Sequence, residues 1–303
     1  MLSDVESSSS SSLSSVSLNY LRTLIHYARV RSQVYIFAWT ALISVLIATN
    51  LNPDPFVAIR AVAAIYLLAL ATYIYNDITD IKADSVNSSN RPLVSGRVSR
   101  NLVLVLSFIL NSAGILLALS INIYVALVAA AWLVLGVVYS HPKTNLKDKF
   151  PYKTIINSAG AGLAAIIGGA AVESFSLYLV YVTSLAVTFL WILGPLGDIN
   201  DLRGDRMAGK RTLPLIIGVL PTVIMMLTIT PGIAITSFII RDLIDMNMLA
   251  LFMILGVSVG SVYILRPLIW KWNNEHLIKM TRHKMRLMHL LLQLSLLIGL
   301  LQF

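Results

Sequence analysis

Cysteine is absent from the 303-residue sequence, and charged residues are scarce. Without thiols, the chain offers no disulfide, no thiolate nucleophile and no Cys-ligated zinc or iron–sulfur site. Asp, Glu, Lys and Arg make up 12% of the residues, whereas about 25% is usual in soluble domains. Hydrophobic residues make up 57%, and the mean hydropathy is +0.80. This composition excludes an ordinary soluble enzyme and indicates a membrane protein.

Acidic residues are the rarer sign of charge, with 14 Asp and Glu against 23 Lys and Arg. The resulting net charge of +9 is typical of a membrane protein whose loops lie beside an anionic membrane surface. We therefore expect a lipid bilayer and no nucleic acid as the partner of the basic residues. The sequence implies no protein partner.

The expected membrane spans are the long stretches between consecutive charged residues, because a crossing helix needs about 20 apolar residues. The stretch 101–142 is about twice that length, so we divide it near Ser120–Asn122. The stretch 212–240 contains two prolines but is too short for two crossings, so we expect one long, kinked helix there. The stretches are 32–53, 61–76, 101–142, 154–172, 174–197, 212–240, 246–265 and 287–303.

These stretches predict an all-α protein with nine transmembrane helices. If the N-terminus is cytoplasmic, all the Lys and Arg residues except Arg60 and Arg241 fall on the cytoplasmic side, as the positive-inside rule requires. Residues 1–18 are rich in serine and contain no apolar run, so we expect a disordered tail rather than a signal peptide. Residues 19–303 then form a single nine-helix domain.

Six of the acidic residues form two short clusters with the same spacing, D-x-x-D-x-x-x-D, at the cytoplasmic ends of the second and sixth spans. They are Asp77, Asp80 and Asp84, and Asp198, Asp201 and Asp205. Both clusters are followed by a basic residue and a Pro–Leu pair, which resembles an internal duplication. If each helix continues through its cluster, at about 100° per residue, these carboxylates and Asn76 share one face.

Carboxylates crowded on one helix face repel one another, so a cation is expected between them. Oxygen ligands without His or Cys favour Mg²⁺, which usually shares its coordination with substrate phosphates. Ionisable groups at membrane depth are costly and usually mark function, and two matching clusters strengthen that interpretation. The metal-ligand candidates are Asn76, Asp77, Asp80, Asp84, Asp198, Asp201 and Asp205. The sequence leaves open whether Asp198 or Asp201 is the direct ligand.

Basic residues occur at the same level of the membrane. Carboxylates, Lys and Arg side chains and Mg²⁺ together are the arrangement expected for a diphosphate group. The candidates for contacting its oxygens are Arg29, Arg91, Lys143, Lys153, Arg206 and Lys210. Arg91 and Lys143 are the two we favour, because Arg91 lies in a turn-rich loop and Lys143 follows Tyr139 by four residues.

The spacings Asn76-x-x-x-Asp80-x-x-x-Asp84 and Asp201-x-x-x-Asp205, with Tyr139-x-x-x-Lys143 between them, resemble the motifs of the UbiA superfamily of intramembrane prenyltransferases. The resemblance covers the chain from about residue 20 to its end. One departure is Gly197, where many relatives have Asn or Asp four residues before the position of Asp201.

The resemblance implies nine helices around a central cavity and Mg²⁺-dependent transfer of an isoprenyl group from a prenyl diphosphate to a lipophilic acceptor. The acceptor stays open between an aromatic, quinone-type ring and an isoprenyl glycerol phosphate. An apolar chamber, with aromatic residues such as Tyr73, Trp132 and Trp191, would hold the prenyl tail and protect an allylic cation from water. The residues expected to act in catalysis are Asp80, Asp84, Tyr139, Lys143, Asp201 and Asp205.

Two other functions fit parts of the pattern. A secondary transporter or cation exchanger also uses intramembrane acids, but near the bilayer centre on broken helices. An isoprenoid-diphosphate hydrolase would use the same metal site with water as the acceptor. Ion flux without a diphosphate would indicate the transporter, and free prenol as the product would indicate the hydrolase.

Overall fold

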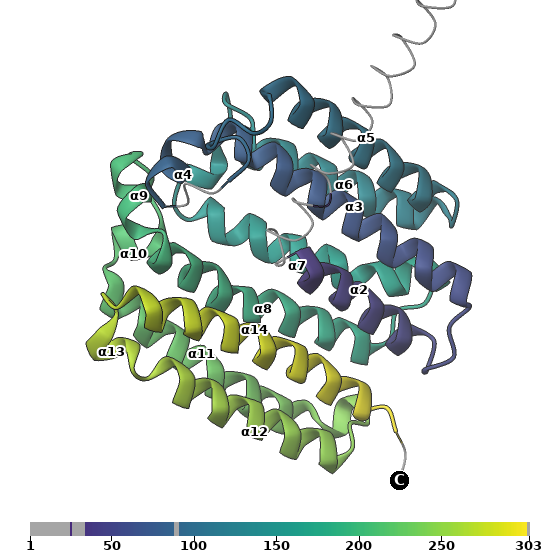
Figure 1. The fold of residues 1–303 in the computed structure, drawn as a ribbon. Coiled ribbons are helices and arrows are strands. Elements are labelled where there is room, and N and C mark those ends of the chain that lie inside the picture. Colours follow the sequence, from purple (N-terminus) through teal and green to yellow (C-terminus); the bar gives the residue numbers. More distant parts are fainter. Residues whose placement is uncertain (1–24, 26–33, 88–90, 302–303) are drawn as a thin grey trace, which may run out of the picture.

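The computed structural model describes residue 25 and residues 34–87 and 91–301. The proposed tail, residues 1–18, and Arg29 lie outside the described residues. Within this part of the chain every secondary-structure element is a helix, and the long helices run roughly parallel and antiparallel to one another (Figure 1). The prediction of an all-α fold is therefore confirmed.

Seven of the described helices are long and apolar enough to cross a membrane, counting α12 and α13 together. They are α3 (Pro55–Thr79), α5 (Arg100–Leu119), α6 (Ile123–Ser140), α7 (Tyr152–Val172), α8 (Leu177–Asn200), α11 (Val219–Ile240) and α12 (Met248–Leu265) with α13 (Leu268–Lys271). Two further helices, α2 (Val34–Ala48) and α14 (Glu275–Ile298), match the first and last expected spans. Crossing by α2 and α14 stays a prediction, since α2 has 15 described residues and the first half of α14 is charged.

Capping residues explain where several helices begin. Asp54 caps α3, where its carboxylate accepts from the Phe56 backbone N–H at 2.7 Å and Pro55 occupies the first turn. Asn122 caps α6 by accepting from the Val125 N–H at 2.9 Å. The division of the stretch 101–142 near residues 120–122 is thus confirmed, because α5 ends at Leu119 and Asn122 starts the next helix.

The stretch 212–240 differs from the prediction of one long helix. It contains the short helix α10 (Leu213–Ile216), then a break at Gly218, then α11. Gly218 has a φ of +94°, a conformation that L side chains rarely adopt, so the chain changes direction there. Pro231, by contrast, lies inside α11.

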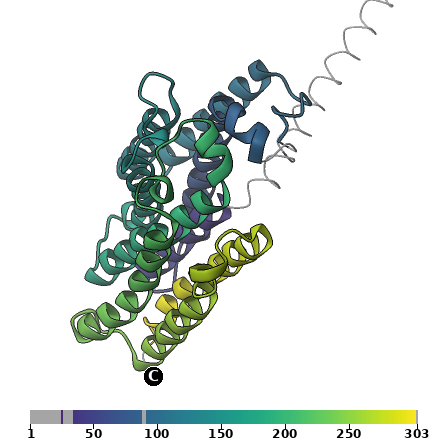
Figure 2. The same ribbon diagram turned by 90° about the vertical axis from the view of Figure 1, so that its left-hand side faces the viewer.

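The bundle has two hydrophobic cores that share α2 and α8. One core joins α2, α3, α5, α6 and α7, with Ala186 and Leu190 of α8. The other joins α8, α11, α12 and α14, with Ile43 and Ile47 of α2. The C-terminal helices therefore form one side of the bundle, shown in green to yellow in Figures 1 and 2.

The contact between α2 and α7 is especially close. Ser44 of α2 donates to the Ala165 carbonyl and accepts from the Gly168 N–H at 3.0 Å. A Cβ at Gly168 would overlap the backbone of Ser44. Small residues let membrane helices approach in this way.

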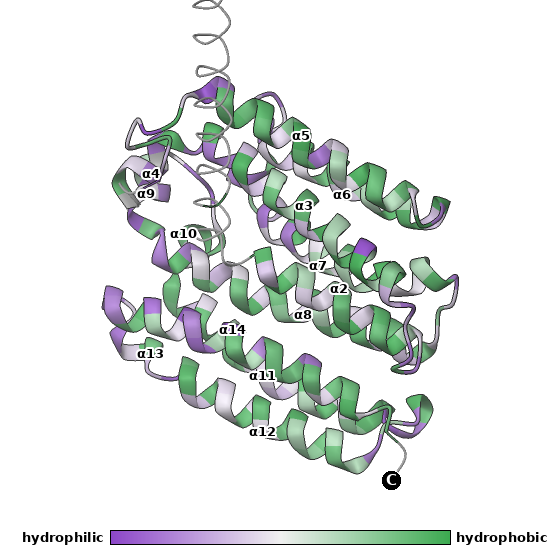
Figure 3. Cartoon of the chain, turned by 45° about the vertical axis from the view of Figure 1, so that its right-hand side comes forward, coloured by the Kyte–Doolittle hydropathy of each residue, from purple (hydrophilic) through white to green (hydrophobic). Residues whose placement is uncertain are grey.

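Four short helices gather at one end of the bundle: α4 (Ile81–Asn87), α9 (Leu202–Met207), α10 and α13 (Figure 1). Hydrophilic residues concentrate at this end, and the long helices beyond it are mostly hydrophobic (Figure 3). Both acidic clusters are at this end, because α3 and α8 both finish there.

Candidate active site

Each acidic cluster lies at a junction between a long helix and a short one, so the helix is interrupted for one residue within each cluster. Helix α3 ends at Thr79 and α4 begins at Ile81, while α8 ends at Asn200 and α9 begins at Leu202. The intervening residues, Asp80 and Asp201, have nearly the same backbone conformation, with φ, ψ of −99°, 4° and −100°, 9°. The two junctions therefore share a local geometry, as an internal duplication predicts.

The helical hydrogen-bond pattern nevertheless continues through the first junction. The Asp80 N–H donates to the Asn76 carbonyl at 3.0 Å, and the Asp84 N–H donates to the Asp80 carbonyl at 2.9 Å. The second junction repeats this pattern, from Asp201 to Gly197 and from Asp205 to Asp201. This continuity keeps the carboxylates spaced by four residues on the same side of the chain.

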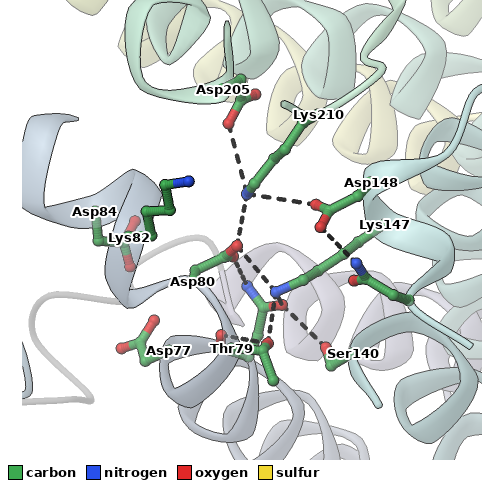
Figure 4. Close-up of polar contacts among 12 residues, drawn as sticks. Asp77, Thr79, Asp80, Lys82, Asp84, Ser140, Lys147, Asp148, Asp205 and Lys210 are labelled. Carbon is green, nitrogen blue, oxygen red and sulfur yellow. Dashed lines mark hydrogen bonds and ion pairs between the residues drawn. The ribbon is translucent and has the colours of Figure 1, made fainter. Parts of the chain in front are cut away.

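Lys210 joins the two clusters. Its Nζ lies 2.5 Å from Oδ1 of Asp80 and 3.5 Å from Oδ1 of Asp205, so these two oxygens are no farther apart than the sum of the two distances. Figure 4 shows Lys210 between Asp80, Asp205 and Asp148, and the Nζ–Oδ1 distance to Asp148 is 3.6 Å. The short helices α4 and α9 also pack against each other. The two motifs are thus neighbours in space.

Lys147 binds the first motif from a third direction. It belongs to a single turn of 3₁₀ helix at Leu146–Asp148, and its Nζ lies 2.9 Å from Asp80 Oδ1. The same ammonium donates to Asn76 Oδ1 at 2.9 Å and to Thr79 Oγ1 at 2.5 Å (Figure 4). Asn76 in turn donates to Asp80 Oδ2 at 2.5 Å. Asp80 therefore lies inside a dense polar network.

Two further cations bind the remaining carboxylates. Lys153, in the first turn of α7, lies 2.5 Å from Asp198 and 3.6 Å from Asp205. Arg91 pairs with Asp84 and lies 3.4 Å from Asp77. Buried acids of both motifs are therefore matched by buried or half-buried cations.

These pairings change the pKa of the groups at the helix ends. Burial alone would raise the pKa of Asp80, but the attraction of Lys147 and Lys210 lowers it below the ordinary range of a carboxyl. Burial lowers the pKa of Lys147 despite the opposing effect of Asp80. For Lys210, the attraction of Asp80 and Asp205 outweighs burial and raises the pKa. At neutral pH, Asp80 and Lys210 are therefore charged.

The acidic motifs open into a cavity of about 960 Å³. Its polar end is at the helix junctions, and its lining becomes apolar along α8 toward Leu193 and Leu190. Trp132 forms part of the apolar lining and packs edge-on against Phe37, with 5.1 Å between the ring centroids. Tyr73 and Tyr139 line it as well, whereas Trp191 is outside the lining. The cavity thus combines a charged end with an aromatic, apolar interior.

The cavity contains most of the predicted site residues. Those in its lining are Asn76, Asp80, Asp84, Arg91, Tyr139, Lys153, Asp198, Asp201, Asp205 and Lys210. Three other candidates lie outside the lining: Asp77 is buried beside Arg91, and Lys143 and Arg206 are exposed on the surface. The structure therefore does not place Lys143 at the site, and Lys147 occupies the position next to Asp80 instead.

Several basic lining residues were missed by sequence reasoning: Arg97, Lys147, Lys279, Arg282 and Arg286. The basic segment 143–153 predicts a lysine near the site. It does not predict which of its lysines lies there. The residues of α14 are part of the positive charge at this end of the bundle, and no acidic motif in the sequence marks them.

The chemistry of the lining fits Mg²⁺. Its metal-ligand candidates offer only carboxylate and amide oxygens, which Mg²⁺ prefers. Among the described residues, however, no three Asp, Glu or His side chains come together closely enough to hold an ion by themselves. Lysine ammonium groups form ion pairs with these carboxylates. A metal ion in the place of the ammonium groups would need additional oxygen ligands. A diphosphate would supply them.

The sequence profile of the UbiA prenyltransferase family matches residues 37–290. The chain therefore belongs to this family and is a prenyltransferase. With seven helices that can cross a bilayer, it is also a multi-pass membrane protein.

Curated relatives include digeranylgeranylglyceryl phosphate synthases of archaea. That of Sulfurisphaera tokodaii is 30% identical over 200 residues, which are 64% of this chain and 69% of the relative. That of Saccharolobus solfataricus is 32% identical over 50% of this chain and 54% of the relative. That of Sulfolobus acidocaldarius is 28% identical over 75% of this chain and 81% of the relative.

Solved structures support the fold. A structure described as digeranylgeranylglyceryl phosphate synthase superposes with a TM-score of 0.71 at 22% identity, covering 93% of this chain and 98% of that one. A UbiA homologue from Archaeoglobus fulgidus bound to GPP and Mg²⁺ gives a TM-score of 0.68 at 18% identity, covering 92% and 99%. The same homologue bound to DMAPP and Mg²⁺ gives 0.66 at 17% identity, covering 89% and 98%.

Proposed function

We propose that the chain transfers an isoprenyl group from a prenyl diphosphate to an isoprenyl glycerol phosphate, and that the transfer depends on Mg²⁺. The observation that carries this proposal is the position of Lys210, which contacts Asp80 of one acidic motif and Asp205 of the other at the charged end of an apolar cavity. The fold thus places a cation, the ammonium group of Lys210, between the two motifs. The archaeal relatives support the choice of acceptor.

The residues that would hold Mg²⁺ are Asn76, Asp80, Asp84, Asp198, Asp201 and Asp205, all of which line the cavity. Bound there with a diphosphate, Mg²⁺ would neutralise the charge that develops on the leaving group. Asp198 is buried and paired with Lys153, whereas Asp201 is half-buried and accepts from Asn200 at 2.7 Å. This difference favours Asp201 as the direct ligand.

The protein's own cations would bind the phosphate oxygens. Arg91, Lys147, Lys153 and Lys210 all lie in the lining beside the acidic motifs. When a diphosphate enters, these side chains would donate to phosphate oxygens in place of carboxylate oxygens. Both kinds of hydrogen bond are charge-assisted and therefore strong. The cations then stabilise the diphosphate as it leaves.

In the transfer, the bond between the allylic carbon and the diphosphate oxygen breaks, and the diphosphate takes the electron pair. The acceptor hydroxyl oxygen bonds to that carbon to form an ether, and its proton passes to the departing diphosphate. The apolar lining around Trp132 and Leu193 excludes water from the allylic cation. Tyr139 is part of the same lining, and its π system would stabilise this cation.

The proposed orientation places the end that carries the acidic motifs on the cytoplasmic side of the cell membrane. Arg60, near the start of α3, and Arg241, at the end of α11, lie at the opposite end of the bundle. This distribution follows the positive-inside rule. Single cysteines can be introduced at positions 82 and 242, since the parent chain has no cysteine. Their accessibility to a membrane-impermeant thiol reagent tests the orientation.

Product analysis tests the proposed reaction. The purified protein is incubated in detergent with labelled geranylgeranyl diphosphate, geranylgeranylglyceryl phosphate and Mg²⁺, and the products are identified by mass spectrometry. A glycerol phosphate with two prenyl ethers is the expected product. Free prenol as the sole product would show a hydrolase, and an alkylated hydroxybenzoate from a parallel reaction would show an aromatic acceptor. Cation flux through proteoliposomes without a diphosphate would support a transporter. Each of these results would overturn the proposal.

A further inference from the structure

We propose that Lys279, Arg282 and Arg286 of α14 form a second anion subsite, which binds the phosphate group of the acceptor. The inference rests on the proposed function and adds to it the residues that select a phosphorylated acceptor. It depends on their place in the cavity, on the balance of charge in the lining, and on Gly197.

The three side chains share one face of α14. They are spaced by three and then four residues, which places them about one turn apart on the same side of a helix. All three line the cavity that also contains both acidic motifs. Lys279 is exposed, whereas Arg282 and Arg286 are half-buried, so the series runs from the mouth of the cavity inward.

The lining carries more positive than negative charge. Its acidic residues are the five aspartates Asp80, Asp84, Asp198, Asp201 and Asp205. Its basic residues are Arg91, Arg97, Lys147, Lys153, Lys210, Lys279, Arg282 and Arg286. The basic residues outnumber the aspartates by three, which is the number of basic residues that α14 contributes. Mg²⁺ would increase this excess of positive charge, so the cavity can hold an anion besides the diphosphate.

Gly197 lets Arg282 of α14 lie next to the second acidic motif. It occupies the position in that motif that Asn76 occupies in the first, four residues before the aspartate at the helix junction. A Cβ at Gly197 would lie 3.8 Å from Nη2 of Arg282. The missing side chain therefore leaves room for a guanidinium beside α8, and α14 packs directly against α8. A phosphate bound by Arg282 would be close to the diphosphate site.

This proximity suits the chemistry of the acceptor. A glycerol phosphate with one prenyl ether has a single free hydroxyl, which is at most two carbons away from the carbon that bears the phosphate. Fixing that phosphate beside the second acidic motif therefore also brings the hydroxyl close to the allylic carbon. An arginine fork matches a phosphate group well, so Arg282 and Arg286 are the residues expected to distinguish this acceptor from an uncharged ring.

Steady-state kinetics test the subsite. We expect Arg282→Gln and Arg286→Gln each to raise the KM for geranylgeranylglyceryl phosphate about 10-fold or more, as loss of a hydrogen bond between charged groups predicts. The KM for geranylgeranyl diphosphate should change less than about twofold, because the first subsite is intact. Arg282→Lys should recover part of the loss. Lys284→Gln is the matched control, because Lys284 is on α14 but outside the cavity lining.

A direct binding measurement separates failure of the subsite from failure of the proposed reaction. Glycerol 1-phosphate is titrated into the parent protein and the two Gln variants in the absence of a prenyl diphosphate. Binding by the parent and its loss in both variants would support the subsite even if the parent proved to alkylate another acceptor. Equal binding by all three proteins, or an equal rise in the KM of both substrates, would overturn it.

Discussion

The charge of Asp80 should contribute both to folding and to catalysis, and the two contributions can be separated. Asp80→Asn removes the carboxylate nearest to Lys147, whose side chain is only 3% exposed and so cannot regain full hydration. Removing one partner of a buried ion pair costs about 3–5 kcal/mol. The oxygens of Asn76 and Thr79 still accept from Lys147, so we expect a loss near the lower limit.

Replacing the stranded lysine should reverse that loss. In the double variant Asp80→Asn/Lys147→Met, Lys147 is gone and Lys210 keeps Asp148 and Asp205 as partners, so most of the lost stability should return. Prenyl transfer should fall by on the order of 10²–10³-fold in both variants, because each lacks the Asp80 carboxylate, which would hold the Mg²⁺ that neutralises the leaving diphosphate. Stability is measured by thermal unfolding in detergent, followed by Trp fluorescence.

Asp242→Asn provides a matched control. Asp242 pairs with Arg241 at the opposite end of the bundle, and its side chain is 85% exposed, so its removal should cost less than about 1 kcal/mol. Unfolding of Asp80→Asn at the temperature of the parent, or failure of Lys147→Met to restore the stability of the single variant, would contradict a stabilising role of this ion pair.

Three further results are expected. Chelation of divalent ions should abolish prenyl transfer, and added Mg²⁺ should restore it; transfer in excess chelator would contradict a metal role. Lys147→Gln should raise the KM for the prenyl diphosphate strongly, while Lys143→Gln should leave it unchanged, as measured by the same product assay; the opposite order would contradict the placement of Lys147 beside Asp80. Gly168→Val should lower the yield of folded protein by separating α7 from Ser44 of α2, while Gly256→Val should be tolerated, because a Cβ there meets nothing within 4 Å; size-exclusion chromatography checks both.

The positions of the long helices could be predicted from sequence because charge and capping residues mark them locally. Asn122, for example, both interrupts an apolar stretch and caps the next helix. Gly218 gave a weaker signal, since a single glycine in an apolar stretch does not reveal that its φ is positive. The break between α10 and α11 was missed for this reason.

The acidic motifs were predictable because a repeated spacing of carboxylates is rare in an apolar chain. Their lysine partners were less predictable. Lys143 and Lys147 differ by one helical turn in sequence, but a 3₁₀ turn at Leu146–Asp148 directs only Lys147 into the cavity. Arg282 of α14 was missed because its approach to Gly197 depends on tertiary packing between helices about 80 residues apart.

The most direct test of the account is the structure of the protein with a non-hydrolysable geranylgeranyl diphosphate analogue and Mn²⁺ in place of Mg²⁺. We expect anomalous peaks for metal between the two acidic motifs, with oxygens of Asp80 and Asp205 facing a single diphosphate. A diphosphate bound to one motif alone, or metal bound away from both, would contradict the claim that the two motifs act as one site.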